Sequence, residues 1–259
     1  MKKLTKLFNR IKYTDRRRKQ IALNHIERFS GRLYSLIKSQ GFDIIIVPGN
    51  SGLFMGEIAK MVYEEANIDF PEYHAIPVYR DGSDYTDSVK LKNRSISEVL
   101  IIDDEIMTGT SAKICIQSLL RDCPESSYLN VTVIAENMSF EWHHKIPGVS
   151  VYFYPHANSM GGLGNNISYI LGKRDFNKLS KYIPMHKERK QVLAIILSGM
   201  VKTKDNDGKW VFDRTVEGKI SHRTLEYMKI KRQIIGDISV AVKTGIQKRK
   251  DKRMKFVGD

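Results

Sequence analysis

The sequence contains little cysteine and no long hydrophobic run. Cys115 and Cys123 are its only cysteines, which excludes a disulfide framework, and they lack the spacing of metal ligands. No stretch reaches the roughly 18 to 20 apolar residues that a membrane-spanning helix needs, and the basic start is not followed by the apolar segment of a signal peptide. Internal repeats and low-complexity tracts are missing too. We therefore expect a cytoplasmic protein without a membrane partner.

The chain is basic overall, with a formal net charge of +14, but the charge is unevenly distributed. Residues 1–20 carry +8 and residues 173–259 carry +13, whereas residues 21–172 carry −7. This distribution predicts a basic N-terminal arm (1–20), a core domain (21–172) and a basic, mainly helical C-terminal extension (173–259). The basic ends either expose scattered cations on solvated helices or make weak contact with nucleic acid or an acidic partner.

Short apolar segments alternate with segments of helical periodicity within residues 21–172. The expected strands are 42–49, 73–79, 98–103, 128–137 and 148–155, and the expected helices are 21–37, 56–66 and 111–123. This alternation predicts an α/β fold, a parallel twisted sheet with flanking helices. In the extension we expect a helix at 190–201, a turn into a strand at 203–216, and one or two basic helices at 222–249.

The most informative stretch is VLIIDDEIMTGTSA, residues 99–112. Its apolar strand runs directly into three carboxylates, Asp103, Asp104 and Glu105. Adjacent negative charges repel one another and cannot be buried without partners. Because ligands of parallel sheets bind at the carboxyl ends of strands, we expect Asp103 and Asp104 to hold hydroxyl groups or a Mg²⁺-bound sugar.

The residues that follow the carboxylates predict a phosphate site. Gly109 permits a tight turn, and Thr108, Thr110 and Ser111 supply hydroxyls and amides at the start of the next helix. A helix N-terminus favours an anion, phosphate in particular. A sugar phosphate fits the carboxylates and the turn together.

This stretch resembles the phosphoribosyl pyrophosphate motif of the type I phosphoribosyltransferases. The resemblance implies that Asp103 and Asp104 bind the ribose hydroxyls and, through phosphoribosyl pyrophosphate, contact Mg²⁺. It also implies a loop around the 5′-phosphate, made of Met107, Thr108, Gly109, Thr110 and Ser111. An ordinary strand-to-helix turn is the alternative reading of the same residues.

Two further segments correspond to elements of that family. VPGNSGLFMGEIA, residues 47–59, is similar to its pyrophosphate loop, which would comprise Pro48, Gly49, Asn50, Ser51 and Gly52. Family members often carry an Arg or Lys there, where this chain has Asn50 and Ser51. The polar segment 80–97 corresponds in position to the flexible catalytic loop, with Lys90 or Lys92 as the catalytic cation. A plain glycine-rich turn and a solvated charged loop are the alternatives.

The resemblance implies Mg²⁺-dependent transfer of ribose 5-phosphate from phosphoribosyl pyrophosphate to a nitrogenous base, with a homo-oligomer expected. Two other functions stay open on the same fold. One is a non-catalytic regulator that binds this ligand, a nucleotide or nucleic acid, and the other is a structural component of a larger assembly. Release of pyrophosphate would distinguish the enzyme from both.

Overall fold

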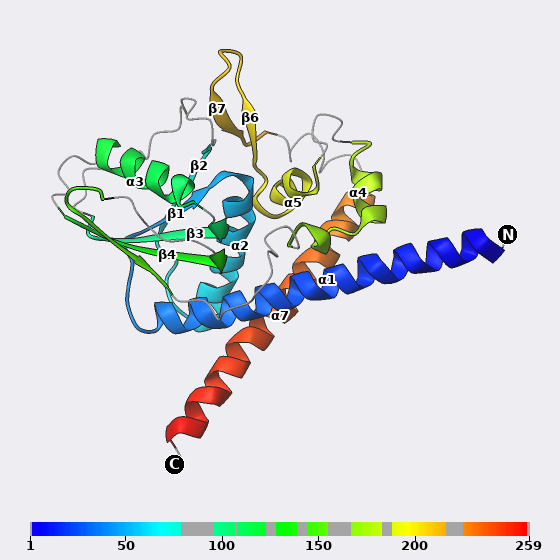
Figure 1. Cartoon of the computed structure of the whole chain (residues 1–259), viewed down its shortest axis with the longest axis horizontal. Coiled ribbons are helices and arrows are strands. Elements are labelled where there is room, and N and C mark those ends of the chain that lie inside the picture. The colour runs from blue at the N-terminus through cyan, green and yellow to red at the C-terminus, as the bar shows by residue number, and fades with distance from the viewer. Residues whose placement is uncertain are drawn as a thin grey trace.

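The computed structural model describes residues 2–78, 96–106, 108–122, 128–138, 145–154, 167–182, 188–215 and 225–257. For 2–14, 137–138, 167 and 252–257 the backbone alone is described. The strands are β1 (Ile44–Pro48), β2 (Glu72–Ile76), β3 (Glu98–Ile106), β4 (Leu129–Met138), β5 (Val149–Phe153), β6 (Val201–Lys204) and β7 (Trp210–Asp213). The helices are α1 (Lys2–Ile37), α2 (Gly49–Ala66), α3 (Thr110–Asp122), the 3₁₀ turn η1 (Ile167–Ile170), α4 (Lys173–Leu179), α5 (Arg189–Ser198) and α7 (Leu225–Val257). Figure 1 shows their arrangement.

The five central strands form one sheet in the order β2-β1-β3-β4-β5, and every neighbouring pair is parallel. All five strands expected from the sequence are present, and the predicted parallel sheet with flanking helices is confirmed. β6 and β7 form a separate antiparallel hairpin, which projects above the sheet in Figure 1.

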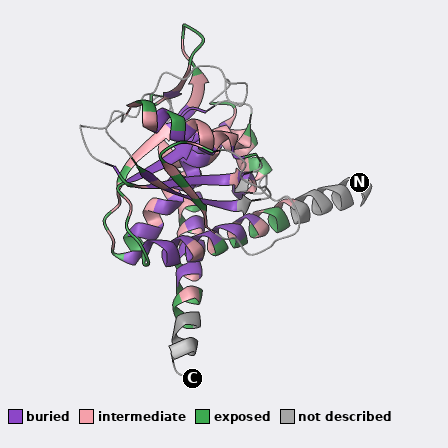
Figure 2. Ribbon diagram, turned by 60° about the vertical axis from the view of Figure 1, so that its left-hand side comes forward, coloured by how far each residue is buried: buried purple, intermediate pink, exposed green. Residues whose placement is uncertain are grey.

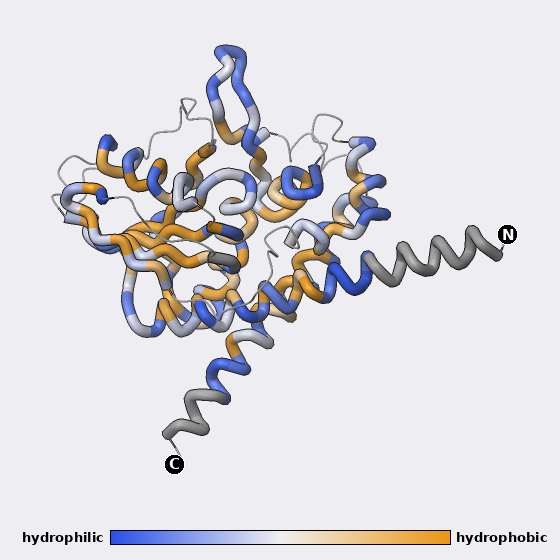
Figure 3. Tube along the Cα trace, in the orientation of Figure 1, coloured by the Kyte–Doolittle hydropathy of each residue, from blue (hydrophilic) through white to orange (hydrophobic). Residues whose placement is uncertain are grey.

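The central strand β1 is apolar throughout because both faces of the sheet are covered there. In β1, Ile45 and Val47 face the cluster made with α1, α2 and α7, whereas Ile44 and Ile46 face the cluster made with α3. All four side chains are completely buried. Figure 2 shows the sheet as the buried centre, and Figure 3 shows that its strands are among the most hydrophobic parts of the trace.

Several elements are longer than the sequence pattern predicted, α1 and β3 among them. α1 is one helix of 36 residues, so the basic arm is continuous with the expected helix at 21–37. The chain has no glycine before Gly31 and no proline before Pro48, so nothing in the arm interrupts the helix. β3 continues to Ile106, which places the three carboxylates inside the strand and not beyond it.

The C-terminal extension packs into the same core as the sheet. α7 is a single helix, and its buried Ile234, Ile238 and Val242 share a cluster with Ile26 and Leu33 of α1. The division into an arm, a core domain and an extension stays a prediction. None of the described helices is long and apolar enough to cross a membrane.

Glycines allow α1 and α7 to cross at backbone contact. A Cβ atom on Gly245 would lie 2.0 Å from the Glu27 carbonyl oxygen, and one on Gly31 would lie 2.8 Å from the Gly245 carbonyl oxygen. Distances this short are overlaps, so a side chain at either glycine would force the helices apart. The ends of both helices extend beyond the crossing (Figure 1).

We expect Gly245→Ala to lower the free energy of unfolding by about 2–3 kcal/mol, because the added methyl overpacks the crossing. Gly236→Ala is the matched control on the same helix, since nothing lies within 4 Å of its Cβ position. The control should gain up to about 1 kcal/mol from better helix propensity. Urea unfolding of both variants checks this, and equal stabilities would contradict the tight crossing.

Candidate functional site

A cleft of about 410 Å³ lies at the carboxyl ends of β1 and β3. The end of β1 and the start of α2 contribute Pro48, Gly49, Asn50 and Ser51 to its wall. The end of β3 contributes Asp103, Asp104 and Glu105, and α3 contributes Ser111. The fold therefore brings the predicted sugar-binding and pyrophosphate-loop residues to one place, as expected for a parallel sheet.

Asp103 and Asp104 are both buried at the cleft, with 7% and 4% of their surface exposed. The Asp104 amide donates to Asp103 Oδ1 at 2.8 Å, which fixes the first carboxylate. Burial, and then the neighbouring charge of Asp104, raise the pKa of Asp103 well above its ordinary value, and Lys190 opposes this shift. Cys115 is also buried, and burial followed by the Asp103 charge raises the pKa of its thiol.

Lys190, at the start of α5, neutralises the second carboxylate. Its Nζ donates to Asp104 Oδ2 at 2.9 Å and to Ser51 Oγ at 3.4 Å. The helix start that carries it is fixed by a capping box between Glu188 and Gln191. One lysine thus joins the acidic strand to the start of α2.

Lys202, on β6, is the second cation of the cleft wall. Its amide donates to Asn50 Oδ1 at 2.7 Å, and its Nζ donates to the Val78 carbonyl at 2.8 Å. Nζ also lies 4.8 Å from the ring centre of Trp210, within cation–π range. The hairpin is therefore attached to the cleft through both the backbone and the side chain of this residue.

The turn after β3 contains the described residues of the predicted phosphate loop, 108–111, and of these only Ser111 lines the cleft. Gly109 has φ of +70°, a left-handed conformation that favours glycine. The hydroxyls of Thr108 and Thr110 lie 2.9 Å apart, and Ser111 lines the cleft in the first turn of α3. The amides of this helix start are donors for a bound anion.

The predicted pyrophosphate loop is mostly helix. α2 begins at Gly49, earlier than the expected 56–66, so Asn50, Ser51 and Gly52 lie in its first turn. Gly49 has φ of +59°, and a Cβ atom on Gly52 would lie 2.9 Å from the Val47 carbonyl carbon. This segment therefore presents to the cleft the backbone amides of a helix start, whereas the prediction was a free loop.

The remaining predicted residues lie outside the described part of the chain: Lys90, Lys92 and Met107. Conversely, sequence reasoning missed Lys190 and Lys202, which line the cleft from the extension. Each belongs to a segment whose local pattern indicates only a helix or a turn and strand. No sequence signal connects them with the 99–112 stretch.

No family model matches the chain, and no curated protein matches it. Solved structures similar to it include a purine phosphoribosyltransferase from Pyrococcus horikoshii, with 16% identity, 52% of this chain and 92% of that chain covered, and a TM-score of 0.36. The xanthine-guanine-hypoxanthine phosphoribosyltransferase of Helicobacter pylori has 11% identity, 49% and 85% coverage and a TM-score of 0.31. A protein from Neisseria gonorrhoeae with bound ppGpp has 19% identity, 50% and 77% coverage and a TM-score of 0.31. Because these identities and scores are low, we base fold and function on the sheet and cleft of this chain.

We expect Asp103→Asn to raise the free energy of unfolding near neutral pH by on the order of 1 kcal/mol. The folded state raises the pKa of Asp103, so the carboxylate destabilises the fold increasingly as pH rises above about 4. Asn removes the charge and can still accept from the Asp104 amide. The gain should be larger at about pH 8 than at about pH 4.

Thermal unfolding across this pH range checks the expectation, with the exposed Asp207→Asn as the control. A gain that does not change with pH would contradict the electrostatic origin. So would an equal gain in the control.

Proposed function

We propose that the chain binds phosphoribosyl pyrophosphate in this cleft and transfers its ribose 5-phosphate to a nitrogenous base. The supporting observation is one cleft lined by two buried carboxylates, Asp103 and Asp104, by Ser111, and by two lysines, Lys190 and Lys202. The proposed substrate has the matching groups, namely sugar hydroxyls, a 5′-phosphate and a diphosphate.

The sugar end would be held by the carboxylates. Ionised Asp103 and Asp104 can accept hydrogen bonds from two ribose hydroxyls. Their burial makes donors especially favourable there, since an unpaired buried charge is costly. The 5′-phosphate would then lie at the start of α3, against the amides that follow Gly109.

The diphosphate end would be held by the lysines of the extension. Lys190 and Lys202 supply the positive charge that Asn50 and Ser51 lack, and both contact that segment. Lys190 lies between Asp104 and Ser51, so a change of its side-chain rotamer could transfer its Nζ from the carboxylate to an anion. Asp104 would then be released to the sugar.

Loss of diphosphate from the sugar leaves positive charge on the C1 carbon, and the protein's contribution is positioning and charge stabilisation. We assign the negative charge that develops on the leaving diphosphate to Lys190 and Lys202, joined by Lys90 or Lys92 from the segment outside the described residues. The carboxylates would hold the sugar while the acceptor attacks its C1 carbon.

The residues of this site would bind Mg²⁺ only together with the ligand. Within the described ranges, no group of three or more His, Cys, Asp or Glu side chains could hold a metal ion. Asp103 and Asp104 offer two carboxylates, so the ligand's own oxygens would have to complete the shell, which is how Mg²⁺ is commonly bound beside phosphates. When bound, the ion would neutralise charge on the diphosphate.

Binding without turnover is the second candidate. It is favoured because the cleft lysines already have partners, Lys190 on Asp104 and Lys202 on the Val78 carbonyl. A ligand that displaces these contacts would shift α5 and the hairpin, as a sensor requires. Pyrophosphate release would select the enzyme, and saturable binding without release would select the sensor.

We expect the double variant Asp103→Asn, Asp104→Asn to abolish binding of phosphoribosyl pyrophosphate in the presence of Mg²⁺, while the fold is retained. Lys190→Met should weaken binding by about tenfold or more, because a charge-assisted contact is lost. Isothermal titration calorimetry measures both effects. Lys209→Met removes an exposed lysine of the hairpin and should leave the affinity unchanged. Unchanged affinity in the double variant would rule out the assignment.

We expect no efficient turnover with hypoxanthine or guanine. In phosphoribosyltransferases of the hypoxanthine type, an Asp often stands at the position of Met107 and handles a purine proton. A thioether is at best a weak acceptor, so these bases should react about 100-fold or more slowly than the preferred one. Pyrophosphate release with a panel of bases measures this. Rapid release with either purine would refute the expectation.

A further inference from the structure

A second hollow, of about 420 Å³, lies between α1 and α7 and shares no lining residue with the cleft. It lies beside the helix crossing, where Gly31 and Gly245 form part of its wall. Without side chains at these positions, backbone forms that part of the wall. The volume is within the usual range for small-ligand sites, roughly 300–1,000 Å³.

Four cations surround this hollow: Arg28, Arg32, Lys248 and Arg249. Its lining contains only two carboxylates, Glu27 and Asp251. Lys248 Nζ donates a hydrogen bond to Glu27 Oε1 at 2.5 Å, so the first of these carboxylates is already paired. Arg249 Nε donates to a neutral group, Ser35 Oγ, at 2.7 Å. Positive charge is therefore in excess around the hollow.

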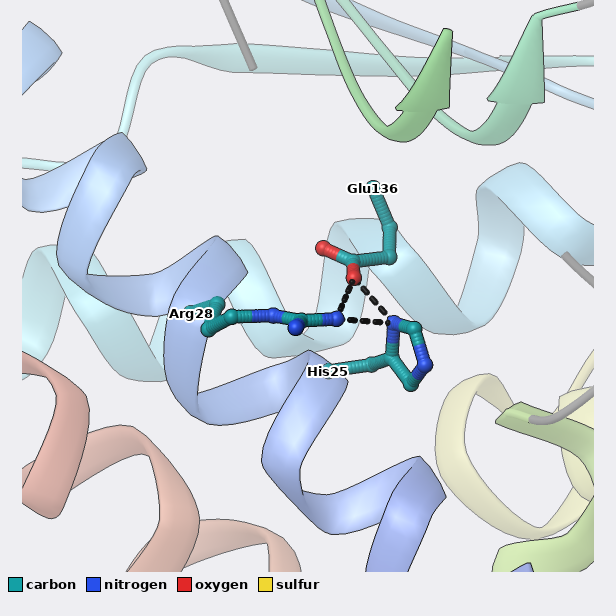
Figure 4. A network of polar contacts seen from close by, with 3 residues as sticks. All are labelled: His25, Arg28 and Glu136. Atoms are coloured by element: carbon teal, nitrogen blue, oxygen red, sulfur yellow. Dashed lines mark hydrogen bonds and ion pairs between the residues drawn. The ribbon is translucent and has the colours of Figure 1, made fainter. Parts of the chain in front are cut away.

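Glu136, at the end of β4, is the nearest buried carboxylate, and it is already engaged. Arg28 Nη2 donates to its Oε1 at 3.0 Å, and His25 Nδ1 is in hydrogen-bond contact with the same oxygen (Figure 4). Glu136 attracts Arg32 through space, but no hydrogen bond joins the two within the described residues. Its charge is shared among three basic groups.

Arg32 has two guanidinium nitrogens without an acceptor among the described residues. Its Nε and Nη2 are buried, and neither has a hydrogen-bond partner within the described structure. Burial is the largest influence and lowers the pKa of this guanidinium, Glu136 and Tyr154 oppose the shift, and the charges of Arg28 and Arg249 add a smaller lowering. Buried polar groups without partners are rare in native proteins, and a bound water or ion is one of the explanations for them.

We propose that the hollow between α1 and α7 binds a small phosphate-bearing anion, with Arg32 and Arg249 as its principal ligands. Guanidinium groups recognise phosphate through paired N–H donors, which an ammonium group cannot reproduce. A bound anion would balance the excess charge and give the Arg32 guanidinium the acceptor that it lacks. The site does not depend on the activity of the cleft, so it stands whether or not the chain is a transferase.

The test is a titration of the full-length protein with inorganic pyrophosphate, followed through the arginine Nε–Hε signals in ¹⁵N-correlated NMR spectra. Arg32→Lys and Arg249→Lys identify the two signals. We expect both to shift saturably in the wild-type protein. A titration with sodium chloride at matched ionic strength should not reproduce the shifts, since screening alone is not binding.

Variants then locate the site. Arg32→Gln should raise the dissociation constant for pyrophosphate, measured through the Arg249 signal, by about tenfold or more. Arg232→Gln, on an exposed face of α7, and Lys190→Met, in the cleft, should leave it unchanged. A failure of the Arg32→Gln variant to fold would leave the wild-type titration decisive.

Four results would overturn the proposal. The first is no saturable shift of the Arg32 signal, and the second is the same shift with chloride. The third is loss of the Arg249 response in Lys190→Met, which would place the anion in the cleft. The fourth is a response to a single-stranded oligonucleotide at lower phosphate concentration than to pyrophosphate, which would make the hollow a nucleic-acid contact.

Discussion

The burial of two neighbouring carboxylates at the edge of a parallel sheet is the constraint on which the site depends. Asp103 and Asp104 are shielded from water directly after the apolar part of β3, and they lie too close to be ionised without compensation. Lys190 supplies that compensation, from a helix far along the chain. The pair also explains why α5 must lie over this end of the sheet, since moving it away would leave a buried charge unpaired. The ion pair thus joins α5 to the cleft, while buried apolar side chains such as Val192 and Ile195 hold the same helix in the core.

Much of the fold follows from local pattern. Each of the five central strands is marked by a short apolar run, and the alternation with helices requires parallel connections. The sequence also predicts the acidic pair and the glycine turn as parts of a site, because carboxylates and a phosphate-binding turn at the end of a parallel strand are typical of one. The sequence does not predict Lys190 and Lys202 as site residues. A lysine at a helix start or in a hairpin strand has no local property that distinguishes it from a solvated one. Local pattern does not give the start of α2, because packing against the sheet extends this helix past its own periodicity, and α1 continues into the arm because no glycine or proline interrupts it.

The basic extension has two separate relations to the rest of the molecule. Its first half places cations over the acidic cleft, whereas α7 places Lys248 and Arg249 beside the arginines of α1. The first arrangement joins opposite charges and the second brings like charges together. Glycine makes the second possible, because backbone contact at Gly31 and Gly245 brings the flanking cations of both helices close. A net charge taken over the whole segment cannot distinguish these two uses.

The pairing of α1 with α7 also bears on how the chain reaches its native state. Ser35 and Arg249, which are hydrogen-bonded across the two helices, are 214 positions apart. During synthesis the apolar stripe of α1 would have to wait roughly 10 to 40 s for its partner to be made, at ordinary elongation rates. In that interval Ile26 and Leu33 can be covered on the sheet side but not on the α7 side. Such long-range closure gives a high contact order, because α7 completes the core around α1 only after the sheet between them in the sequence has been made.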